Sequence, residues 1–320
     1  MRAIRVRRHG GPEVLAAEEV PGPSPGPGEV VVALRAIGVN PVETYLRAGL
    51  HSRRVDFPWT PGSDGAGVVE AVGPGVEGPA VGDRVYTAGS VSGTYAEKAL
   101  CRADEVHPLP ERCSFAQGAA LHVPYATAWR ALHERARARP GETVLVHGAT
   151  GGVGLAAVQI ARAAGLTVIG TGGTPRGLEA VLREGAHHAL DHGREGYLGE
   201  AVRLTGGRGP DVILEMRADR SLARDLGIAA KRGRIVVIGS RGTIEVDPRA
   251  AMTGDLAVLG MSLYNVPREE LAATHREIGK GLEAGILRPV IREELPLADA
   301  PRAHELVLEP GALGKIVLVP

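Results

Sequence analysis

The residues best suited to chemistry lie in a glycine-rich segment near the middle of the chain, residues 143–165. A short apolar run at 144–146 is followed by glycines, then by apolar residues at helical spacing from Val153 to Ala164, and then by a second apolar run at 166–169. This order predicts a strand, a tight turn, a helix and a second, parallel strand. Glycines at such a turn let the backbone approach a pyrophosphate, which binds the free N–H groups at the start of the helix. We therefore expect a dinucleotide site.

The glycine pattern departs from the usual G-x-G-x-x-G. Its frame is Ala149-x-Gly151-x-x-Gly154, with further glycines at 148 and 152. Glycine-rich turns between a strand and a helix also occur without a ligand, but the position between two buried strands favours nucleotide binding.

The end of the second strand indicates which dinucleotide is used. A site for NAD normally has Asp or Glu about 20 residues after the glycine turn, where it binds the ribose 2′-hydroxyl. Residues 170–176 contain no carboxylate, and the first acid is Glu179. An acid would repel a 2′-phosphate, whereas Arg176 would attract it, although Arg176 is also compatible with a solvated loop. The segment therefore favours NADPH.

Composition limits the classes of function. The chain has 320 residues, enough for two domains, and its 37 basic residues balance 37 acidic ones. This balance gives no global field to attract nucleic acid or an anionic membrane. The N-terminus lacks the apolar region of a signal peptide, no run approaches the roughly 20 apolar residues of a membrane span, and the two cysteines suggest no disulfide framework. We expect a soluble, cytoplasmic protein.

The order of predicted elements indicates an inserted nucleotide domain. Residues 1–120 are predicted to be rich in short strands, helices begin near Ser114, and strands alternate with helices from 143 onward. The later strands are expected at 188–190, 212–214, 234–239 and 257–261, followed by a long helix from 268 to about 284 and a closing strand at 315–319. The N- and C-terminal parts should then share one domain.

Five segments in this order and spacing give the chain a specific resemblance: GPEVL at 11–15, GVNPVETYLR at 38–47, PGSDGAG at 61–67, VHGATGGVGL at 146–155 and IGSRGTIE at 238–245. The chain resembles, from end to end, the zinc-free medium-chain dehydrogenases/reductases, most closely the zeta-crystallin-like quinone oxidoreductases. The resemblance implies an α/β protein with a GroES-like β-rich catalytic domain (1–122 and 265–320) and a doubly wound Rossmann dinucleotide-binding domain (123–264).

The positions that bind catalytic zinc in the wider superfamily differ here. Asn40 stands where a cysteine ligand is expected, and Gly62-Ser63-Asp64 replaces Gly-His-Glu. Four histidines, at 51, 107, 122 and 133, are isolated in the sequence and do not complete a ligand set. We therefore expect no metal, which makes alcohol oxidation improbable because no Lewis acid is present.

The resemblance also implies the site residues. Asn40 and Tyr45 would lie beside the nicotinamide as catalytic residues that position the acceptor or cofactor, although Asn40-Pro41 alone is typical of a turn and Tyr45 of a buried aromatic residue. Glu43 is expected in solvent or as a helix cap. Besides Tyr45, the implied cofactor-binding residues are Thr150, Gly151, Gly152, Val153, Gly173, His192, Ile238, Gly239, Ser240 and Arg241, with Arg176 added by the argument above. Ser221 replaces an asparagine of the family, and its shorter side chain argues against a direct contact with the cofactor.

The expected activity is transfer of reducing equivalents from NADPH to quinones without a metal. An alternative is an NADPH-dependent alkenal or enone double-bond reductase, and an alternative of another class is a nucleic-acid-binding or structural crystallin-like protein. The aromatic content of 3% makes a base-stacking surface improbable. Residues 256–264 are apolar and should form the outermost strand of the nucleotide domain, which favours a homodimer or a homotetramer, although an internal strand covered by helices would look equally apolar.

Overall fold

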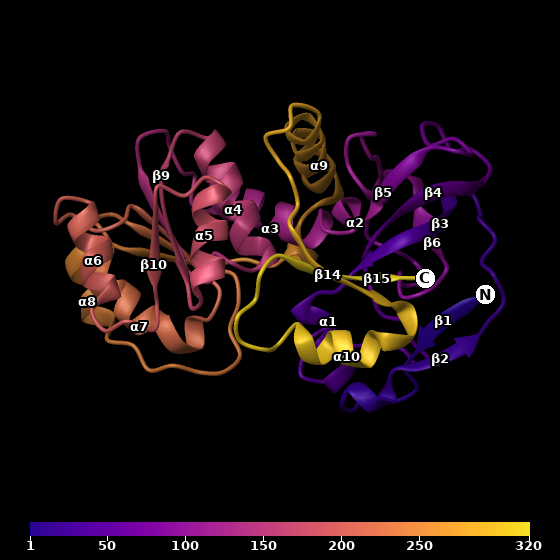
Figure 1. Cartoon of the computed structure of the whole chain (residues 1–320), viewed down its shortest axis with the longest axis horizontal. Helices are drawn as coiled ribbons and strands as arrows, with labels where there is room; N and C mark the ends of the chain where they lie inside the picture. The colour runs from indigo at the N-terminus through magenta and orange to yellow at the C-terminus, as the bar shows by residue number, and fades with distance from the viewer. The chain divides into compact units, whose positions relative to one another are not determined.

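The computed structural model describes the whole chain, residues 1–320, and divides it into two compact units. The first unit contains Met1–Val123, His275–Pro310 and Gly314–Pro320, and the second contains Pro124–Thr274 and Gly311–Leu313. The N-terminal segments (indigo) and the C-terminal strands (yellow) thus belong to the same unit (Figure 1).

Antiparallel strands dominate the first unit. One sheet has the order β14-β15-β3-β4-β5-β7, β6 also pairs with β3, and β1 and β2 form a separate pair. Only β14 and β15 run parallel to each other. The strands are β1 (Arg2–Arg5), β2 (Ala16–Glu19), β3 (Glu29–Gly38), β4 (Asp64–Val72), β5 (Arg84–Ala88), β6 (Lys98–Arg102), β7 (Val106–Pro108), β14 (Ile291–Pro296) and β15 (Lys315–Val319).

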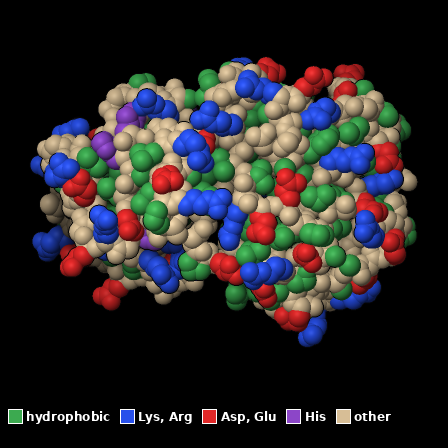
Figure 2. All heavy atoms as spheres, in the orientation of Figure 1, with side chains coloured by type: hydrophobic (Ala, Val, Ile, Leu, Met, Phe, Trp, Pro, Cys, Tyr) green, Lys and Arg blue, Asp and Glu red, His purple; other side chains and the backbone are tan.

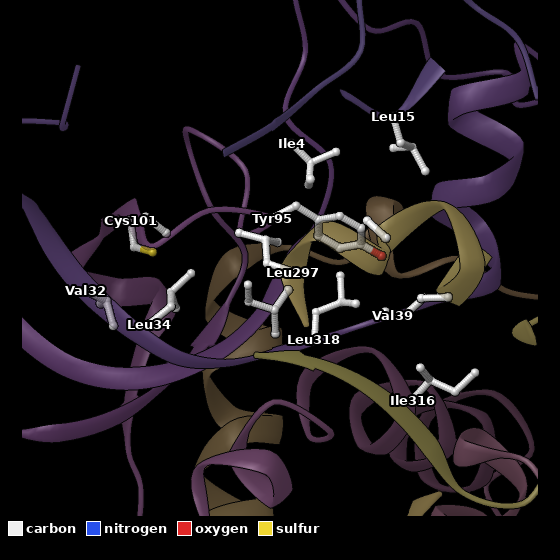
Figure 3. Packing of buried hydrophobic residues seen from close by; sticks show 14 of the residues in the cluster. Ile4, Leu15, Val32, Leu34, Val39, Tyr95, Cys101, Leu297, Ile316 and Leu318 are labelled. Atoms are coloured by element: carbon white, nitrogen blue, oxygen red, sulfur yellow. The ribbon is translucent and has the colours of Figure 1, made fainter. Parts of the chain in front are cut away.

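The core of the first unit is aliphatic and encloses one aromatic ring that carries a hydroxyl group. Figure 3 shows Tyr95 among Ile4, Val39, Leu297 and Leu318, all of them buried. These contacts hold the strands together, because removal of apolar surface from water is the main favourable contribution to folding. The shorter elements of this unit are η1 (Pro12–Val14), α1 (Pro41–Ala48), η2 (Ala103–Glu105), α2 (Phe115–Gly118), η6 (Leu297–Asp299) and α10 (Ala300–Leu306).

The second unit is a six-stranded parallel sheet in the order β10-β9-β8-β11-β12-β13. Numbered along the unit, this order is 3-2-1-4-5-6, that of a doubly wound dinucleotide-binding fold. The predicted fold class is confirmed. The strands are β8 (Thr143–Val146), β9 (Thr167–Gly172), β10 (His188–Asp191), β11 (Val212–Glu215), β12 (Arg234–Val237) and β13 (Ala257–Gly260).

Helices connect the parallel strands on both faces of this sheet. Right-handed crossovers place α4 (Gly152–Ala163) and α5 (Pro175–Arg183) on one face and α6 (Tyr197–Leu204), α7 (Ala218–Ile228) and α8 (Pro248–Gly254) on the other (Figure 1). Side chains of the last three helices pack on the central strands in one cluster. The remaining elements are the π-helical turns η3 (His122–Ala126) and η4 (Arg130–Arg135), with α3 (Thr127–Trp129) between them, then η5 (Leu263–Asn265) and α9 (Arg268–Glu283).

One edge of the parallel sheet is β13, which lies within residues 256–264, the segment predicted to form the outermost strand. β13 pairs only with β12, and Val258 on it is 45% exposed. The alternative of an internal, covered strand is therefore wrong.

Charges of both signs are mixed on the face of the molecule drawn in Figure 2. The face drawn in Figure 2 shows Lys and Arg side chains interspersed with Asp and Glu on each unit. No helix is long and apolar enough to cross a bilayer.

Candidate cofactor and active site

The glycine-rich turn between β8 and α4 has room for a ligand on one side and none on the other. Gly148 has φ +57°, in the left-handed region. A Cβ on Gly154 would lie 2.4 Å from the Gly148 carbonyl oxygen and 2.6 Å from the Ala149 Cα, so this glycine lets the helix pack closely against the turn. A Cβ on Gly151 would meet only the Gly148 oxygen, at 3.7 Å, and otherwise open space. Gly151 is therefore the place where a ligand can approach the backbone.

The start of α4 provides the polarity that a pyrophosphate needs. Gly151 is the N-cap, the first turn carries no acidic residue, and the 12-residue helix directs its free N–H groups toward this end. The Thr150 side chain fills the space beside Gly172 and Gly177, since a Cβ on either glycine would lie 2.8 Å from its Cγ2. The residues of the turn thus fit a dinucleotide.

Three of the predicted cofactor-binding residues, Gly173, Arg176 and His192, lie near the ends of β9 and β10. A Cβ on Gly173 would lie 2.9 Å from Nε2 of His192, so the structure brings these two together, and the His192 amide donates to the Gly172 carbonyl at 3.0 Å. Arg176 lies in the first turn of α5, and both Arg176 and His192 are exposed. Asp191 accepts from the Gly193 amide at 2.8 Å. Two basic side chains that follow the neighbouring strands β9 and β10 suit a 2′-phosphate.

The segment from Ile238 to Arg241 follows β12, which ends at Val237, two residues before the predicted end. Beyond it, the Gly239 carbonyl accepts from the Ala218 amide at 2.9 Å, and Ser240 Oγ donates to the Gly242 carbonyl at 2.9 Å. The chain therefore leaves the sheet here and turns toward the start of α7.

Sequence reasoning missed Met216, which lies against both the glycine turn and the segment 238–241. Its side chain lies 3.6 Å from the position of a Cβ on Gly148, and its carbonyl oxygen lies 2.6 Å from that of a Cβ on Gly239. Only its position directly after β11 signals this role. Ser221, by contrast, is buried on α7, and its hydroxyl accepts from Arg224 at 3.3 Å.

A buried charged cluster lies beneath the glycine turn. His147 Nε2 is 2.9 Å from Asp225 Oδ1 and 3.8 Å from Glu215 Oε2, and the two carboxylates are fully buried. Burial lowers the pKa of His147, but its bond to Asp225 outweighs this and raises it. Burial, together with the proximity of Asp225, raises the pKa of Glu215 to about 8. A proton held on Glu215 would relieve the repulsion between the two carboxylates.

In the first unit, three strand ends bring Asn40, Asp64 and Lys315 together. Asp64 starts β4 opposite Gly38, the last residue of β3, and Lys315 starts β15, which pairs with the same end of β3. Lys315 Nζ donates to Asp64 Oδ2 at 2.8 Å and to Asn40 Oδ1. All three side chains are at most 4% exposed.

Both amide hydrogens of Asn40 are used inside this unit. Its Nδ2 donates to Asp64 Oδ2 at 3.1 Å and to Glu43 Oε1 at 3.2 Å, while its oxygen accepts from Lys315. Asn40 also begins a helix rather than a turn: it is the N-cap of α1, and Glu43 Oε2 caps its backbone N–H at 2.8 Å. Glu43 is thus a helix cap as predicted, but it is buried and not in solvent.

A chain of hydrogen bonds extends from Glu43 away from Asn40. Arg47 donates to His304 Nδ1 at 3.1 Å, which leaves the proton of this neutral ring on Nε2, 3.1 Å from the Tyr95 hydroxyl. Tyr95 in turn donates to Glu43 Oε2 at 2.8 Å. Burial lowers the pKa of His304 to about 3, helped by Arg47. Burial also raises the pKa of Glu43 to about 7, although Lys315 and hydrogen bonds oppose it.

Tyr45, the other predicted catalytic residue, lies on α1 and is half-buried. Glu43 and Arg47 lie on the buried side of the same helix, whereas Tyr45 lies on its more exposed side. Tyr45 is the member of the predicted catalytic pair whose side chain is the more accessible.

Two of the histidines that are isolated in the sequence are not isolated in space. His122 Nδ1 lies 3.1 Å from His275 Nε2, the His107 ring stacks on His275 at 4.5 Å, and Tyr86 Oη lies 3.1 Å from His275 Nδ1. Burial lowers the pKa of all three histidines, to about 4 for His107. The sequence reasoning failed because the partners are up to 189 residues apart.

The residues at the expected zinc position do not fit a zinc ion. Asn40 and Asp64 offer an amide oxygen and a carboxylate, and both oxygens already accept from the Lys315 ammonium. Ser63 stands in place of the histidine ligand. Cys101 and Cys113 are buried free thiols. Zinc in proteins is bound by Cys, His and carboxylate side chains, and of Asn40, Ser63 and Asp64 only Asp64 is of this kind. The Lys315 ammonium would also repel a second cation.

Comparison with known proteins agrees with this architecture. Residues 26–111 match the family model for an alcohol dehydrogenase GroES-like domain, and residues 152–279 match that for a zinc-binding dehydrogenase. Two solved structures cover all of this chain and all of their own: an NAD-dependent alcohol dehydrogenase, with a TM-score of 0.93 at 32% identity, and the Escherichia coli quinone oxidoreductase complexed with NADPH, with 0.90 at 33%. The quinone oxidoreductase of Rattus norvegicus is 47% identical over 321 residues, which cover 100% of this chain and 98% of the rat protein. The chain belongs to the zeta-crystallin-like quinone oxidoreductase family of the medium-chain dehydrogenase/reductase superfamily.

Proposed function

We propose that the protein is an NADPH-dependent quinone reductase that works without a metal ion. The observation that carries this proposal is the full-length relationship to quinone oxidoreductases, at 47% identity with 98% coverage of the rat relative. The glycine turn that accommodates a pyrophosphate and the basic, acid-free end of β9 support the choice of cofactor.

The nucleotide unit supplies the cofactor contacts in this proposal. Thr150, Gly151, Gly152 and Val153 bind the pyrophosphate at the start of α4. Gly173 leaves room for the ribose phosphate, and Arg176 and His192 pair with the 2′-phosphate. Ile238, Gly239, Ser240 and Arg241 approach the nicotinamide side.

NADPH supplies the reducing equivalents when it is bound, and the protein contributes binding, orientation and polarity. In the first unit we assign the positioning roles to Asn40 and Tyr45. The Asn40 amide is held by three neighbours, so we assign it the shaping of the site, and we assign the contact with cofactor or acceptor to Tyr45, the more accessible side chain of the two. An acceptor that is already electrophilic, such as a quinone, needs no Lewis acid.

A steady-state screen of NADPH oxidation tests the function. Benzoquinone, naphthoquinone and phenanthrenequinone are compared with a small enone at equal concentrations. We expect the highest kcat/KM with a quinone. Turnover of the enone alone would instead identify a double-bond reductase, and no turnover of any acceptor would reject the proposed activity.

The alternative of a nucleic-acid-binding protein is tested by filter binding at two salt concentrations. Binding driven by phosphate contacts must weaken as the salt concentration rises. The formal net charge of zero and the mixed charges on the face drawn in Figure 2 predict no tight binding at either concentration.

Assembly, location and the functional division of the chain are further parts of the proposal. We propose a homodimer, or a homotetramer, in which the exposed edge of β13 pairs with its copy in a second chain. We also propose a cytoplasmic location. In the same proposal, residues 1–122 and 265–320 form the catalytic domain, and residues 123–264 form the nucleotide-binding domain.

A further inference from the structure

We propose that the ammonium group of Lys315 takes the place of a metal ion in the catalytic unit, where it neutralises Asp64 and holds the Asn40 carboxamide in one orientation. Lys315 is a positioning residue in this proposal. Its effect on turnover rests on the proposed function, whereas its effects on folding and on cation binding do not.

The geometry around Lys315 is that of a small, built cation site. Its Nζ contacts two oxygens, Asp64 Oδ2 at 2.8 Å and Asn40 Oδ1, and is buried with them. Asp64 Oδ1 accepts from the Val123 amide at 3.1 Å, so both carboxylate oxygens have partners. A buried lysine is stable as a cation only when its charge is paired and its hydrogens are bonded.

The backbone is shaped to admit the lysine side chain. A Cβ on Gly38 would lie 2.8 Å from Lys315 Cε and 2.9 Å from Asp64 Cβ. It would also lie 2.0 Å from the Ala119 carbonyl oxygen. The missing side chain at Gly38 therefore lets β15 deliver its first residue to the ends of β3 and β4.

The ammonium also decides which way the Asn40 amide faces. An ammonium has only donors, so the atom of Asn40 that contacts Lys315 must be the oxygen. The amide nitrogen then faces Asp64 and Glu43, both acceptors. Without the ammonium, only the acceptors Asp64 and Glu43 would oppose rotation of the amide by 180°, and Asp64 would be a buried charge without its cation.

Two substitutions separate the charge from the orientation. Lys315→Met keeps the length of the side chain but leaves Asp64 unpaired, so we expect the melting temperature to fall by roughly 5–10 °C. The double variant Lys315→Met/Asp64→Asn removes both charges and should recover most of this loss. As a matched control, Lys98→Met removes the exposed lysine that pairs with Glu70 in the same unit, and should change neither stability nor turnover.

The kinetic result distinguishes positioning from charge balance. We expect the double variant to fold well but to keep a kcat about tenfold below wild type, with KM for NADPH unchanged, because the ammonium no longer holds the Asn40 oxygen and Glu43 alone still orients the amide. A double variant with wild-type kcat would overturn the positioning role. If Lys315→Met does not fold, the double variant alone decides.

Chemical rescue tests the cation itself, without any acceptor. Lys315→Ala leaves a space of the size of propylammonium. Added propylammonium should raise the melting temperature of this variant, and propanol at the same concentration should not. Equal rescue by propanol would show that the lysine only fills space, and zinc bound stoichiometrically at Asn40 and Asp64 in the wild-type protein would refute the proposal outright. If the wild-type protein reduced no acceptor but propylammonium alone still stabilised Lys315→Ala, the proposed function would be rejected and the assignment of the cation site would stand.

Discussion

A pair of glycine-to-alanine substitutions should separate cofactor binding from folding in the turn before α4. Gly151 and Gly154 are three residues apart, but their Cβ positions face different surroundings. At Gly154 the methyl group would overlap backbone atoms, with contacts of 2.4–2.7 Å, so the backbone of the turn or of the helix would have to shift. At Gly151 the methyl group would point into open space, and the backbone (φ −76°, ψ 172°) suits any residue.

The expected magnitudes follow from these contacts. Overpacking of this kind costs about 1–3 kcal/mol, reduced by the roughly 1 kcal/mol that alanine gains over glycine within a helix. Gly154→Ala should therefore lower the melting temperature by a few degrees, since about 1 kcal/mol shifts it by roughly 2–4 °C in a protein domain of 150–250 residues. Gly151→Ala should stay within about 2 °C of wild type, because the entropic gain of alanine roughly offsets its weaker N-cap preference.

For NADPH affinity we expect the larger loss from Gly151→Ala, the variant that should hardly change stability. The Gly151 methyl group would keep the pyrophosphate away from the N–H groups of the helix, and loss of one hydrogen bond to a charged group costs about 1.5–3 kcal/mol. This corresponds to a Kd for NADPH that is about 10- to 150-fold weaker. Melting temperature without cofactor and Kd by titration calorimetry measure the two effects. Wild-type affinity in a well-folded Gly151→Ala variant would refute the assignment of this turn to the pyrophosphate.

Four further predictions follow from the same structure. Glu215 keeps its proton in the folded state while the unfolded carboxyl loses it, so its contribution to the free energy of unfolding should fall as pH rises from about 4.5 to about 8. His304 stays neutral in the folded state, so its contribution should fall as pH drops from about 6.5 toward 3. The two contributions oppose each other between pH 4.5 and 6.5, so urea titrations compare wild type with Glu215→Gln, which should lose the fall in stability between pH 6.5 and 8 that Glu215 causes. Arg176→Ala or His192→Ala should lower kcat/KM about 10- to 150-fold with NADPH but little with NADH. Equal losses with both cofactors would show that the substituted residue does not bind the 2′-phosphate. Exhaustive chelation should leave quinone reduction intact, and stoichiometric zinc whose removal abolishes activity would contradict this. Val258→Lys should convert a dimer, measured by light scattering, into a folded monomer, whereas an unchanged dimer would place the interface elsewhere.

Local pattern predicted the nucleotide unit well, because its elements are set by short-range rules. The apolar run before Gly148 is β8, the apolar spacing from Val153 is α4, and the apolar segment around Val258 is the edge strand. Each of these is decided by residues within one strand or one helical turn. The parallel order then follows from short connections and right-handed crossovers.

The buried polar groups were not predictable in the same way. Glu43 was expected in solvent or as a cap, and the structure buries it as a cap with a partner 52 residues away, the Tyr95 hydroxyl. His122 meets His275 across 153 residues. Charged and polar residues are usually exposed, so sequence reasoning assigns them to the surface unless it knows which distant groups pair with them.

Asn40 shows how the surroundings change what a site residue can do. Resemblance places it beside the nicotinamide, where its amide would hydrogen-bond an acceptor. In the structure each polar atom of that amide already has a partner within the first unit, so a contact with the acceptor would require one of these bonds to break. Breaking a buried bond to a charged group costs more than a new bond to a neutral quinone oxygen returns. The amide is therefore better suited to keep Lys315, Asp64 and Glu43 in place, and direct contact with the acceptor falls to side chains that remain accessible, such as Tyr45.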